Sequence, residues 1–304
     1  MGFDIHAVTF LVAAKSAGVS FSEVATLGRQ AFATDCKPLQ KLFDLAGIKE
    51  DARKVVSESN GYAERFLQCL GAHDVCSIDN SPYEGAAVVH DMNQPVSDSL
   101  KNKFTCVIDG GTLEHIFDFP QAIRNCMEMI RVGGHFLGIT VANNFVGHGF
   151  YQFSPELFYR IFSPENGFQT ELVMVREVHP RAAWYRVVDP AAVQSRVELV
   201  NGRPTYILVI AKRIAAGDIF LRSPQQSDYS VQWRQHDGRA SGMGDSIPED
   251  STARGRRWLL PLLRRTIKRL LGSYWAVSPF RYMSRYYEKV DEEKWVRGTN
   301  DGIT

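Results

Sequence analysis

The sequence predicts an α/β protein built on a doubly wound, mostly parallel sheet. Short apolar runs recur in the first half of the chain, and each ends in an acidic residue: residues 75–79, 86–91 and 106–109. Such runs are typical of parallel strands buried on both faces, with the acids at the strand carboxyl ends. Segments with helical apolar spacing alternate with them, as a doubly wound sheet requires. At 304 residues and 44% hydrophobic content, the chain can form a sizeable core.

The N-terminal quarter is expected to be largely helical. Residues 1–20 predict a helix with Ile5, Val8, Leu11 and Val12 on one face, and a strand follows at 24–28. Residues 37–72 predict polar helices with two apolar stripes. Together with the run at 75–79, these segments predict the first two strands and the helices that connect them.

The second half predicts one more parallel strand and a late pair. A helix over 121–130 is expected to stop at Gly133-Gly134, before a strand at 136–140. An aromatic segment covers 145–162; its phenylalanines suit a core, and Ser154 suits a helix cap. Strands at 168–178 and 205–211 follow.

Four regions can be distinguished along the chain. Residues 1–20 form an N-terminal helix, 21–212 the α/β domain, and 213–255 a polar linker rich in Ser, Gln, Gly and Asp. Residues 256–304 form a basic, amphipathic C-terminal helical extension.

Composition limits the possible partners and location. The formal net charge of +1 gives no electrostatic case for nucleic acid. The five cysteines contain no C-x-x-C pair and no metal-like spacing with histidine, so the sequence predicts no metal and reduced thiols in a cytoplasm. The N-terminus has no signal-like pattern, and no apolar run reaches the roughly 20 residues of a spanning helix.

One stretch carries a family resemblance. Residues 104–116 form a hydrophobic strand, an Asp-Gly-Gly turn and Leu-Glu-His, and an Arg-x-Gly-Gly precedes the next strand at 136–140. This sequence resembles the fourth and fifth strands of class I S-adenosylmethionine-dependent methyltransferases, in particular those of the methyltransferase type 11 group. Over residues 20–212, the resemblance implies a Rossmann-like methyltransferase fold with seven strands. It also implies S-adenosylmethionine as cofactor and a transferase activity, methylation.

The resemblance assigns cofactor contacts residue by residue. Asp79 matches the acid that accepts hydrogen bonds from the ribose, Asp91 the acid that accepts from the adenine amino group, and Met92 a residue beside the base. Turn capping is the structural alternative for both acids. Asp109, Gly110 and Gly111 match the backbone turn around the methionine portion; there, glycines permit a close approach.

The first loop departs from the family pattern. Family members carry Gly-x-Gly-x-Gly after the first strand, whereas this chain has Thr26-Leu27-Gly28-Arg29-Gln30. Either Gly28 alone makes the close approach, with Arg29 or Gln30 supplying polar contacts, or cofactor binding is weakened. The gap between Asp79 and Asp91 is also too short for a helical crossover and predicts a compact turn through 81–85.

The residues expected to face the acceptor follow the fourth and fifth strands. Glu114 and His115 match the family's Leu-Glu-His element at the mouth of the active site, where the resemblance assigns Glu114 to the cofactor-binding residues. His115 and His148 are candidate bases, because histidine accepts a proton near neutral pH; His115 also suits a wall or a helix cap. Asn144 and Tyr151 are the candidate substrate-binding residues.

The segment 256–271, which begins at Arg256 and ends at Leu271, has an apolar face and many basic residues. This pattern suits peripheral contact with an anionic membrane surface, or a helix packed on the domain with its charges in solvent.

Together these features predict S-adenosylmethionine-dependent methyl transfer to a small-molecule or glycan acceptor, with oxygen as the methylated atom. The alternative is a catalytically inactive methyltransferase-like protein that serves in binding or as a scaffold. A nicotinamide-dependent dehydrogenase is disfavoured, because no G-x-G-x-x-G follows a predicted strand.

Overall fold

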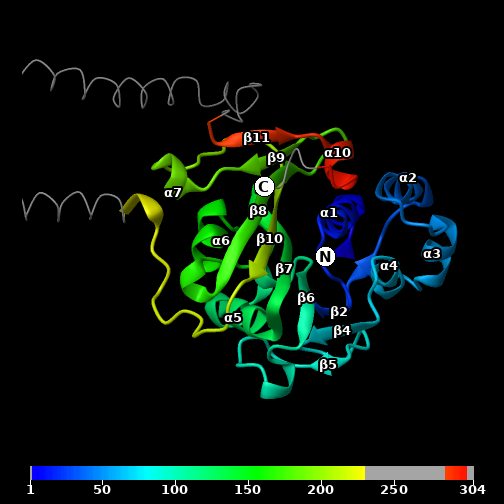
Figure 1. Ribbon diagram of the computed structural model, residues 1–304, viewed down its shortest axis with the longest axis horizontal. Coiled ribbons are helices and arrows are strands. Elements are labelled where there is room, and N and C mark those ends of the chain that lie inside the picture. Colours follow the sequence, from blue (N-terminus) through cyan, green and yellow to red (C-terminus); the bar gives the residue numbers. More distant parts are fainter. Residues whose placement is uncertain (1, 230–284, 300–304) are drawn as a thin grey trace, which may run out of the picture.

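The computed structural model describes residues 2–229 and 285–299 and contains one large mixed sheet with helices on both faces (Figure 1). The order of the strands in this sheet is β11-β9-β8-β10-β7-β6-β2-β4-β5, and a separate parallel pair joins β1 to β3. The predicted α/β, doubly wound class is therefore confirmed. The main sheet has nine strands rather than the expected seven.

The parallel half of the sheet holds the five predicted strands. They are β2 (Glu23–Leu27), β4 (Asp74–Asp79), β5 (Val88–Val89), β6 (Phe104–Asp109) and β7 (Ile130–Asn143). The chain runs outward from β2 through β4 to β5 and then returns to β6 on the other side of β2. This reversal creates a topological switch point between β2 and β6, the place where open α/β sheets bind ligands at their carboxyl edge.

The antiparallel half extends the other edge. The strand β10 (Thr205–Arg213) lies between β7 and β8 (Phe168–Glu177) and is antiparallel to both. This arrangement confirms the predicted late pair. Two strands that the sequence did not predict, β9 (Trp184–Val187) and β11 (Tyr287–Val290), continue the sheet beyond β8.

Each face of the sheet packs against its own hydrophobic cluster. On the central strands, Cys106, Ile108 and Leu137 point to one side, and Val107 and Phe136 point to the other. This alternation follows from the two-residue period of a strand. The first side carries α1 (Ile5–Ser16), α2 (Cys36–Ala46), α3 (Ala52–Glu58) and α4 (Glu64–Cys69), and the second carries α5 (Phe119–Met129) and α6 (Pro155–Ile161).

The remaining described elements are short. They are β1 (Gly2–Phe3), β3 (Ala31–Phe32), α7 (Pro190–Val193), α10 (Glu292–Val296) and the 3₁₀ turns η1 (Asp98–Leu100), η2 (Leu113–His115) and η3 (Pro164–Asn166).

The N-terminal helix is enclosed rather than amphipathic. Asp4 caps it by accepting from the backbone N–H groups of His6 and Ala7, both at 2.9 Å. The eight residues 7–14 are all buried, so α1 needs apolar neighbours on every side. The C-terminal helix α10 supplies one of them, because the Trp295 ring lies 6.2 Å from Phe10.

The C-terminal part of the chain therefore belongs partly to the domain. Residues 285–299, which the sequence places in an extension, form the edge strand β11 and the helix α10. Part of the predicted linker also packs on the domain: Ile219 is buried, and the Ser227 hydroxyl donates to Glu156 at 2.9 Å. The basic segment at 256–271 lies outside the described residues, and its predicted amphipathic helix stays a prediction.

The boundary between α5 and β7 differs from the expectation. The helix ends at Met129, β7 starts at Ile130, and Gly133 and Gly134 lie inside the strand instead of stopping the helix. A β-carbon on Gly134 would lie 2.8 Å from the Thr105 carbonyl oxygen. This glycine therefore permits the close approach of β6 and β7. Helical periodicity in the sequence could not distinguish a glycine that ends a helix from a glycine that lets two strands approach.

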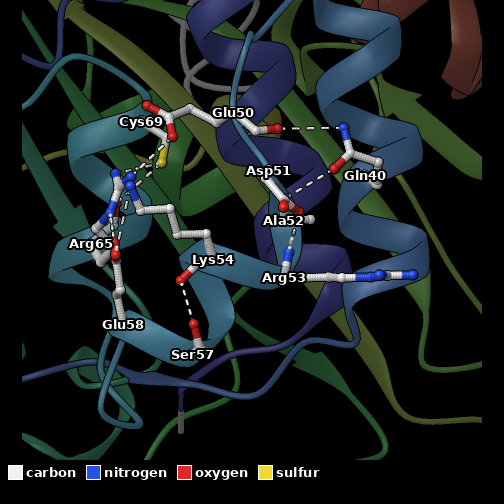
Figure 2. A network of polar contacts seen from close by, with 10 residues as sticks. All are labelled: Gln40, Glu50, Asp51, Ala52, Arg53, Lys54, Ser57, Glu58, Arg65 and Cys69. Carbon is white, nitrogen blue, oxygen red and sulfur yellow. Dashed lines mark hydrogen bonds and ion pairs between the residues drawn. The ribbon is translucent and has the colours of Figure 1, made fainter.

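Polar contacts join the small helices α2, α3 and α4, as Figure 2 shows. Arg65 of α4 donates to Glu58 and Glu50, both at 2.9 Å, and to the Cys69 sulfur at 3.1 Å. Gln40 of α2 accepts from the Ala52 N–H at 2.9 Å, at the start of α3. These contacts fix three short helices that would be marginal alone.

Candidate functional site

The carboxyl ends of three parallel strands meet at Gly28. This residue follows β2 with φ of +73°, and its N–H donates to Ile78 of β4 at 2.7 Å. A β-carbon there would lie 3.5 Å from both the Asp79 carboxylate and the Thr112 hydroxyl. The predicted residues Gly28 and Asp79 are thus neighbours, and Thr112, which the sequence analysis did not single out, completes the group.

Gln30 occupies the space beside the next predicted glycine. Its side-chain amide donates to the Leu27 carbonyl, and its side chain is buried. A β-carbon on Gly110 would overlap the Gln30 Oε1 atom and would lie 2.8 Å from the Phe3 ring. Gln30 and Phe3 therefore fill the volume against Gly110, and the buried Gln30 Oε1 has no hydrogen-bond partner in the part of the chain that the structure describes.

Arg29 points to a different part of the molecule. Its guanidinium bonds to Glu64 at 2.6 Å and to the Glu84 carbonyl at 2.9 Å, and it stacks over the Tyr62 ring at 3.9 Å. Of the two polar residues expected to replace the missing glycines, only Gln30 faces the strand ends. Arg29 joins the loop after β4 to α4.

The loop between β4 and β5 is the predicted compact turn. It contains no helix, and the Gly85 N–H donates to the Pro82 carbonyl at 2.9 Å. The predicted strand at 86–91 shortens to Val88–Val89, because so short a connection lets only two residues pair with β4.

Asp79 and Asp91 both cap turns and lie on adjoining segments. The Asp79 carboxylate accepts from the Ser81 N–H at 3.0 Å, and its backbone carbonyl accepts from the His90 N–H at 2.8 Å. Asp91 accepts from the backbone and side chain of Asn93 at 2.9 and 2.7 Å, and these bonds lower the pKa of Asp91. Turn capping leaves the second oxygen of Asp79 directed at Gly28.

A buried amide that the sequence analysis missed holds the segment after Asp91. Asn125 of α5 donates to the carbonyls of Met92 and Gln94 at 3.0 and 2.7 Å and accepts from the Val96 N–H at 3.2 Å. Met92 itself is buried in the core cluster beneath this loop. In the sequence, the one indication of this role was the position of Asn125 on the otherwise apolar face of its helix, because a buried amide needs hydrogen-bond partners.

The Asp109 loop is tightly constrained from within. The buried Asp109 carboxylate accepts from the N–H groups of Thr112 and Leu113 at 2.9 and 3.2 Å, and Thr112 donates its hydroxyl to Leu27 at 2.8 Å. Burial, and then the nearby Glu114, raise the pKa of Asp109 to about 8. Asp109 therefore shapes the turn from inside, and Gly111 takes the left-handed conformation there at φ +90°.

The two predicted histidines come together beside Glu114. The His115 and His148 rings lie 4.8 Å apart, and His148 Nε2 is 3.6 Å from Glu114 Oε1. The fully buried Glu114 accepts from the Thr140 hydroxyl at 2.7 Å through its other oxygen. Partial desolvation of the ring lowers the pKa of His115, although the residue as a whole is largely exposed.

The predicted substrate-binding groups are largely occupied within the protein. The Asn144 amide donates to Asn201 and to the Arg203 carbonyl at 2.8 to 3.1 Å, and the Tyr151 hydroxyl donates to the Phe117 carbonyl at 2.6 Å. Both residues shape the loop after β7 because their polar groups already have partners. Phe150 in this loop is 66% exposed and is the aromatic side chain that the loop offers to solvent.

The other aromatic residues of this region belong to the core. Phe153, Phe158 and Phe162 are buried, and Ser154 caps α6 by accepting from the Leu157 N–H, as the structural interpretation expected. Tyr206 of β10, which was not predicted, stacks on Phe145 at 5.6 Å. Burial raises the pKa of Tyr206 to about 12, with Asp4 and Glu114 adding to the effect.

No helix within residues 2–229 and 285–299 combines the length and apolar character needed to cross a membrane.

Comparisons with known proteins give low similarity throughout. No protein-family model and no curated protein matches the chain. Among solved structures, a Bacillus halodurans protein named as a methyltransferase is 11% identical, covers 67% of this chain and 97% of its own, and gives a TM-score of 0.38. The 1,6-didemethyltoxoflavin-N1-methyltransferase of Burkholderia thailandensis is 15% identical over 69% of this chain and 79% of its own, with a TM-score of 0.36.

A third similar structure is named as a synthase and not as a methyltransferase. The branched-chain polyamine synthase of Thermus thermophilus is 12% identical, covers 74% of this chain and 60% of its own, and gives a TM-score of 0.35. The function therefore has to be argued from the site of this chain itself.

Proposed function

We propose that this protein binds S-adenosylmethionine at the carboxyl edge of its parallel strands and transfers the methyl group to a small-molecule or glycan acceptor, at an oxygen atom. The observation that carries the proposal is the meeting of Gly28, Asp79 and Thr112 at the switch point between β2 and β6. A bare, left-handed Gly28 leaves its backbone open to a ligand, and a carboxylate oxygen faces the same point.

The residues around this point fit an adenosyl group. Asp79 would accept from the ribose hydroxyls, and Asp91 with the backbone of Met92 would hold the adenine edge. The unpartnered Gln30 Oε1 would accept from the methionine ammonium group. When bound, the cofactor supplies an electrophilic methyl group on its sulfonium.

The methionine portion can lie against Gly110 only if two side chains withdraw. Gln30 and Phe3 now contact this glycine closely. Gln30 has a flexible side chain that can change rotamer once its bond to the Leu27 carbonyl breaks, and Phe3 belongs to a two-residue strand near the N-terminus. We therefore place Gly110 and Gly111 at the cofactor after this movement, while Asp109 and Glu114 support the turn from inside.

The chemistry on the acceptor side suits a hydroxyl group. An imidazole within reach of the acceptor can take the proton that the hydroxyl loses, and His115 and His148 are the two candidates. Asn144 and Tyr151 would define the wall of the acceptor pocket through the loop that they hold. Most of the acceleration would come from alignment of the acceptor oxygen with the methyl group.

One observation favours a second candidate function, that of a methyltransferase-like binding or scaffold protein without activity. The contacts of Gln30 and Phe3 with Gly110 close the position that the methionine portion needs. If this closure is permanent, S-adenosylmethionine does not bind, and Asp79→Ala leaves the cellular phenotype unchanged.

Isothermal titration of the full chain with S-adenosylmethionine and S-adenosylhomocysteine tests the proposal. Loss of a charge-assisted hydrogen bond costs about 1.5–3 kcal/mol, so Asp79→Ala should weaken binding roughly 10- to 100-fold. Asp74→Ala is the matched control, because this exposed carboxylate lies at the opposite end of the same strand. Absence of binding heat from folded protein, or equal affinities of both variants and the wild type, would contradict the proposal.

A further inference from the structure

Three potential metal ligands converge at the end of β6. One ligand atom from each of Glu114, His115 and His148 lies within 4.8 Å of the other two. Among residues 2–229 and 285–299 this is the one such group of three. The set of two imidazoles and one carboxylate is the donor set of many sites for zinc and related divalent transition metals.

One oxygen of the buried Glu114 carboxylate has no hydrogen-bond partner among the described residues. Glu114 has no solvent exposure, and its Oε1 atom makes no hydrogen bond within the described chain. The same holds for the buried His148 Nε2 atom, which faces Glu114 Oε1 at 3.6 Å, beyond hydrogen-bond distance. A buried ionised carboxylate is costly unless it is paired or coordinates a metal.

The spacing matches coordination better than it matches a direct contact. Ligands held at 2.0–2.2 Å around a tetrahedral zinc ion lie roughly 3.3–3.5 Å from one another. The 3.6 Å between Glu114 and His148 is close to this spacing. His115 has an exposed side chain and can turn toward the same point by a change of rotamer.

The backbone holds the ligands in place. The Glu114 carbonyl accepts from the N–H groups of Phe150 and Tyr151 at 2.7 and 3.3 Å, which fastens the loop carrying His148 to the turn carrying Glu114. Gly149 allows this contact, because a β-carbon there would lie 2.6 Å from the same carbonyl. Thr140 orients the carboxylate through its second oxygen, as outer-shell residues commonly do at metal sites.

We propose that Glu114, His115 and His148 bind one divalent transition-metal ion, with Zn²⁺ as the best match to their donor atoms. Three protein ligands leave a coordination position open, and the exposed side of His115 places that position toward solvent. The catalytic role of this ion rests on the proposed function and replaces the general-base role of the two histidines there: the open position would take the acceptor oxygen, since a bound metal lowers the pKa of a coordinated hydroxyl.

The test is a zinc titration of the tag-free full chain after removal of metals with a chelator, in competition with a chromophoric chelator. We expect one tight site in the wild type. Glu114→Gln and His148→Ala should each weaken it by more than about 100-fold, because even outer-shell substitutions cost 10- to 100-fold. Thr140→Val should fall within that outer-shell range. Cobalt(II) should give the visible absorption of a tetrahedral site in the wild type and lose it in His148→Ala.

His135→Ala is the matched control. His135 Nε2 lies 3.5 Å from Glu171, almost the same spacing, but no third ligand joins this pair among residues 2–229 and 285–299. Its substitution should leave zinc affinity unchanged. Equal zinc affinity of the wild type, Glu114→Gln and His148→Ala, or a lack of tight binding by the wild type, would overturn the proposal.

The titration contains no S-adenosylmethionine, so the two proposals fail separately. Cofactor binding that persists without any zinc site overturns only the metal proposal. A zinc site in a protein that does not bind the cofactor overturns only the proposed function.

Discussion

The raised pKa of Asp109 predicts that the stability of the protein falls as pH increases from about 4 to about 8. The native pKa of about 8 lies above the unfolded value near 3.8, so between these values the native state holds a proton that the unfolded state has lost. The favourable contribution is complete below the unfolded pKa and disappears as pH rises through the native pKa. The two pKa values differ by roughly four, and each pKa unit corresponds to about 1.4 kcal/mol. The upper limit of the contribution of Asp109 to the free energy of unfolding is therefore about 5–6 kcal/mol.

Asp109→Asn isolates this effect. Asparagine can still accept from the N–H groups of Thr112 and Leu113 through its carbonyl oxygen, but it does not titrate. Between pH 5 and pH 8, we expect the free energy of unfolding of the variant to increase by about 2–4 kcal/mol relative to that of the wild type. The free energy of unfolding should be measured by urea titration, in the presence of a metal chelator, at each pH.

Asp74→Asn provides the control, because it removes an exposed carboxyl group at the far end of β4, away from the Asp109 turn. Subtracting the wild-type free energy of unfolding from that of Asp109→Asn at each pH cancels the contributions of all groups that titrate alike in both proteins. A free-energy difference between Asp109→Asn and the wild type that stays constant from pH 5 to pH 8 would refute a protonated Asp109 in the native state.

Three further predictions concern packing and buried polar groups. Gly110→Ala should lower the free energy of unfolding by about 1–3 kcal/mol through overpacking, and Gln30→Ala in the same chain should recover part of the loss, measured by urea unfolding; a full penalty in the double variant would argue against the contact. Asn125→Leu should lower the free energy of unfolding by more than about 2 kcal/mol, because two buried backbone groups and the partly buried Gln94 carbonyl lose their partner; proteolysis of the loop after Met92 should accelerate, and an unchanged rate would contradict this role. Trp295→Ala should cost about 3–5 kcal/mol, as expected for a buried tryptophan, and a thermal midpoint equal to that of the wild type would show that α10 does not support the core.

The parallel half of the fold could be predicted because its signals are local. Apolar runs such as those ending at Asp79 and Asp109 are long enough, and regular enough, to identify strands buried on both faces. The strands β9 and β11 gave no such signal. They are four residues each and lie about 100 residues apart. The strand β9 pairs with β8 and β11, and β11 pairs with β9 across a sequence separation that no local pattern contains.

The candidate site also contains one part that the sequence could predict and one part that it could not. The proximity of Gly28 and Asp79 follows from strand order, so the sequence could predict it once the strands were identified. The group formed by Glu114 and His148 depends on how the loop after β7 returns to the turn after β6, and the two residues are separated by 34 positions. Metal-site patterns in sequence rely on short, regular spacings, so this group could not be recognised from them.

Burial of two carboxyl groups in one short turn links the stability of this site to its chemistry. Asp109 and Glu114 are both inaccessible to solvent, and two adjacent buried charges would repel each other strongly. The turn resolves this conflict by treating them differently: Asp109 is kept neutral by burial and holds the loop, while Glu114 faces two imidazoles. The carboxylate of Glu114 is thus placed where a cation can bind it, beside the loop that we assign to the acceptor. An apolar residue in place of Glu114 would favour stability, so the presence of a buried glutamate in the turn after β6 is more consistent with a role in binding than with a role in folding.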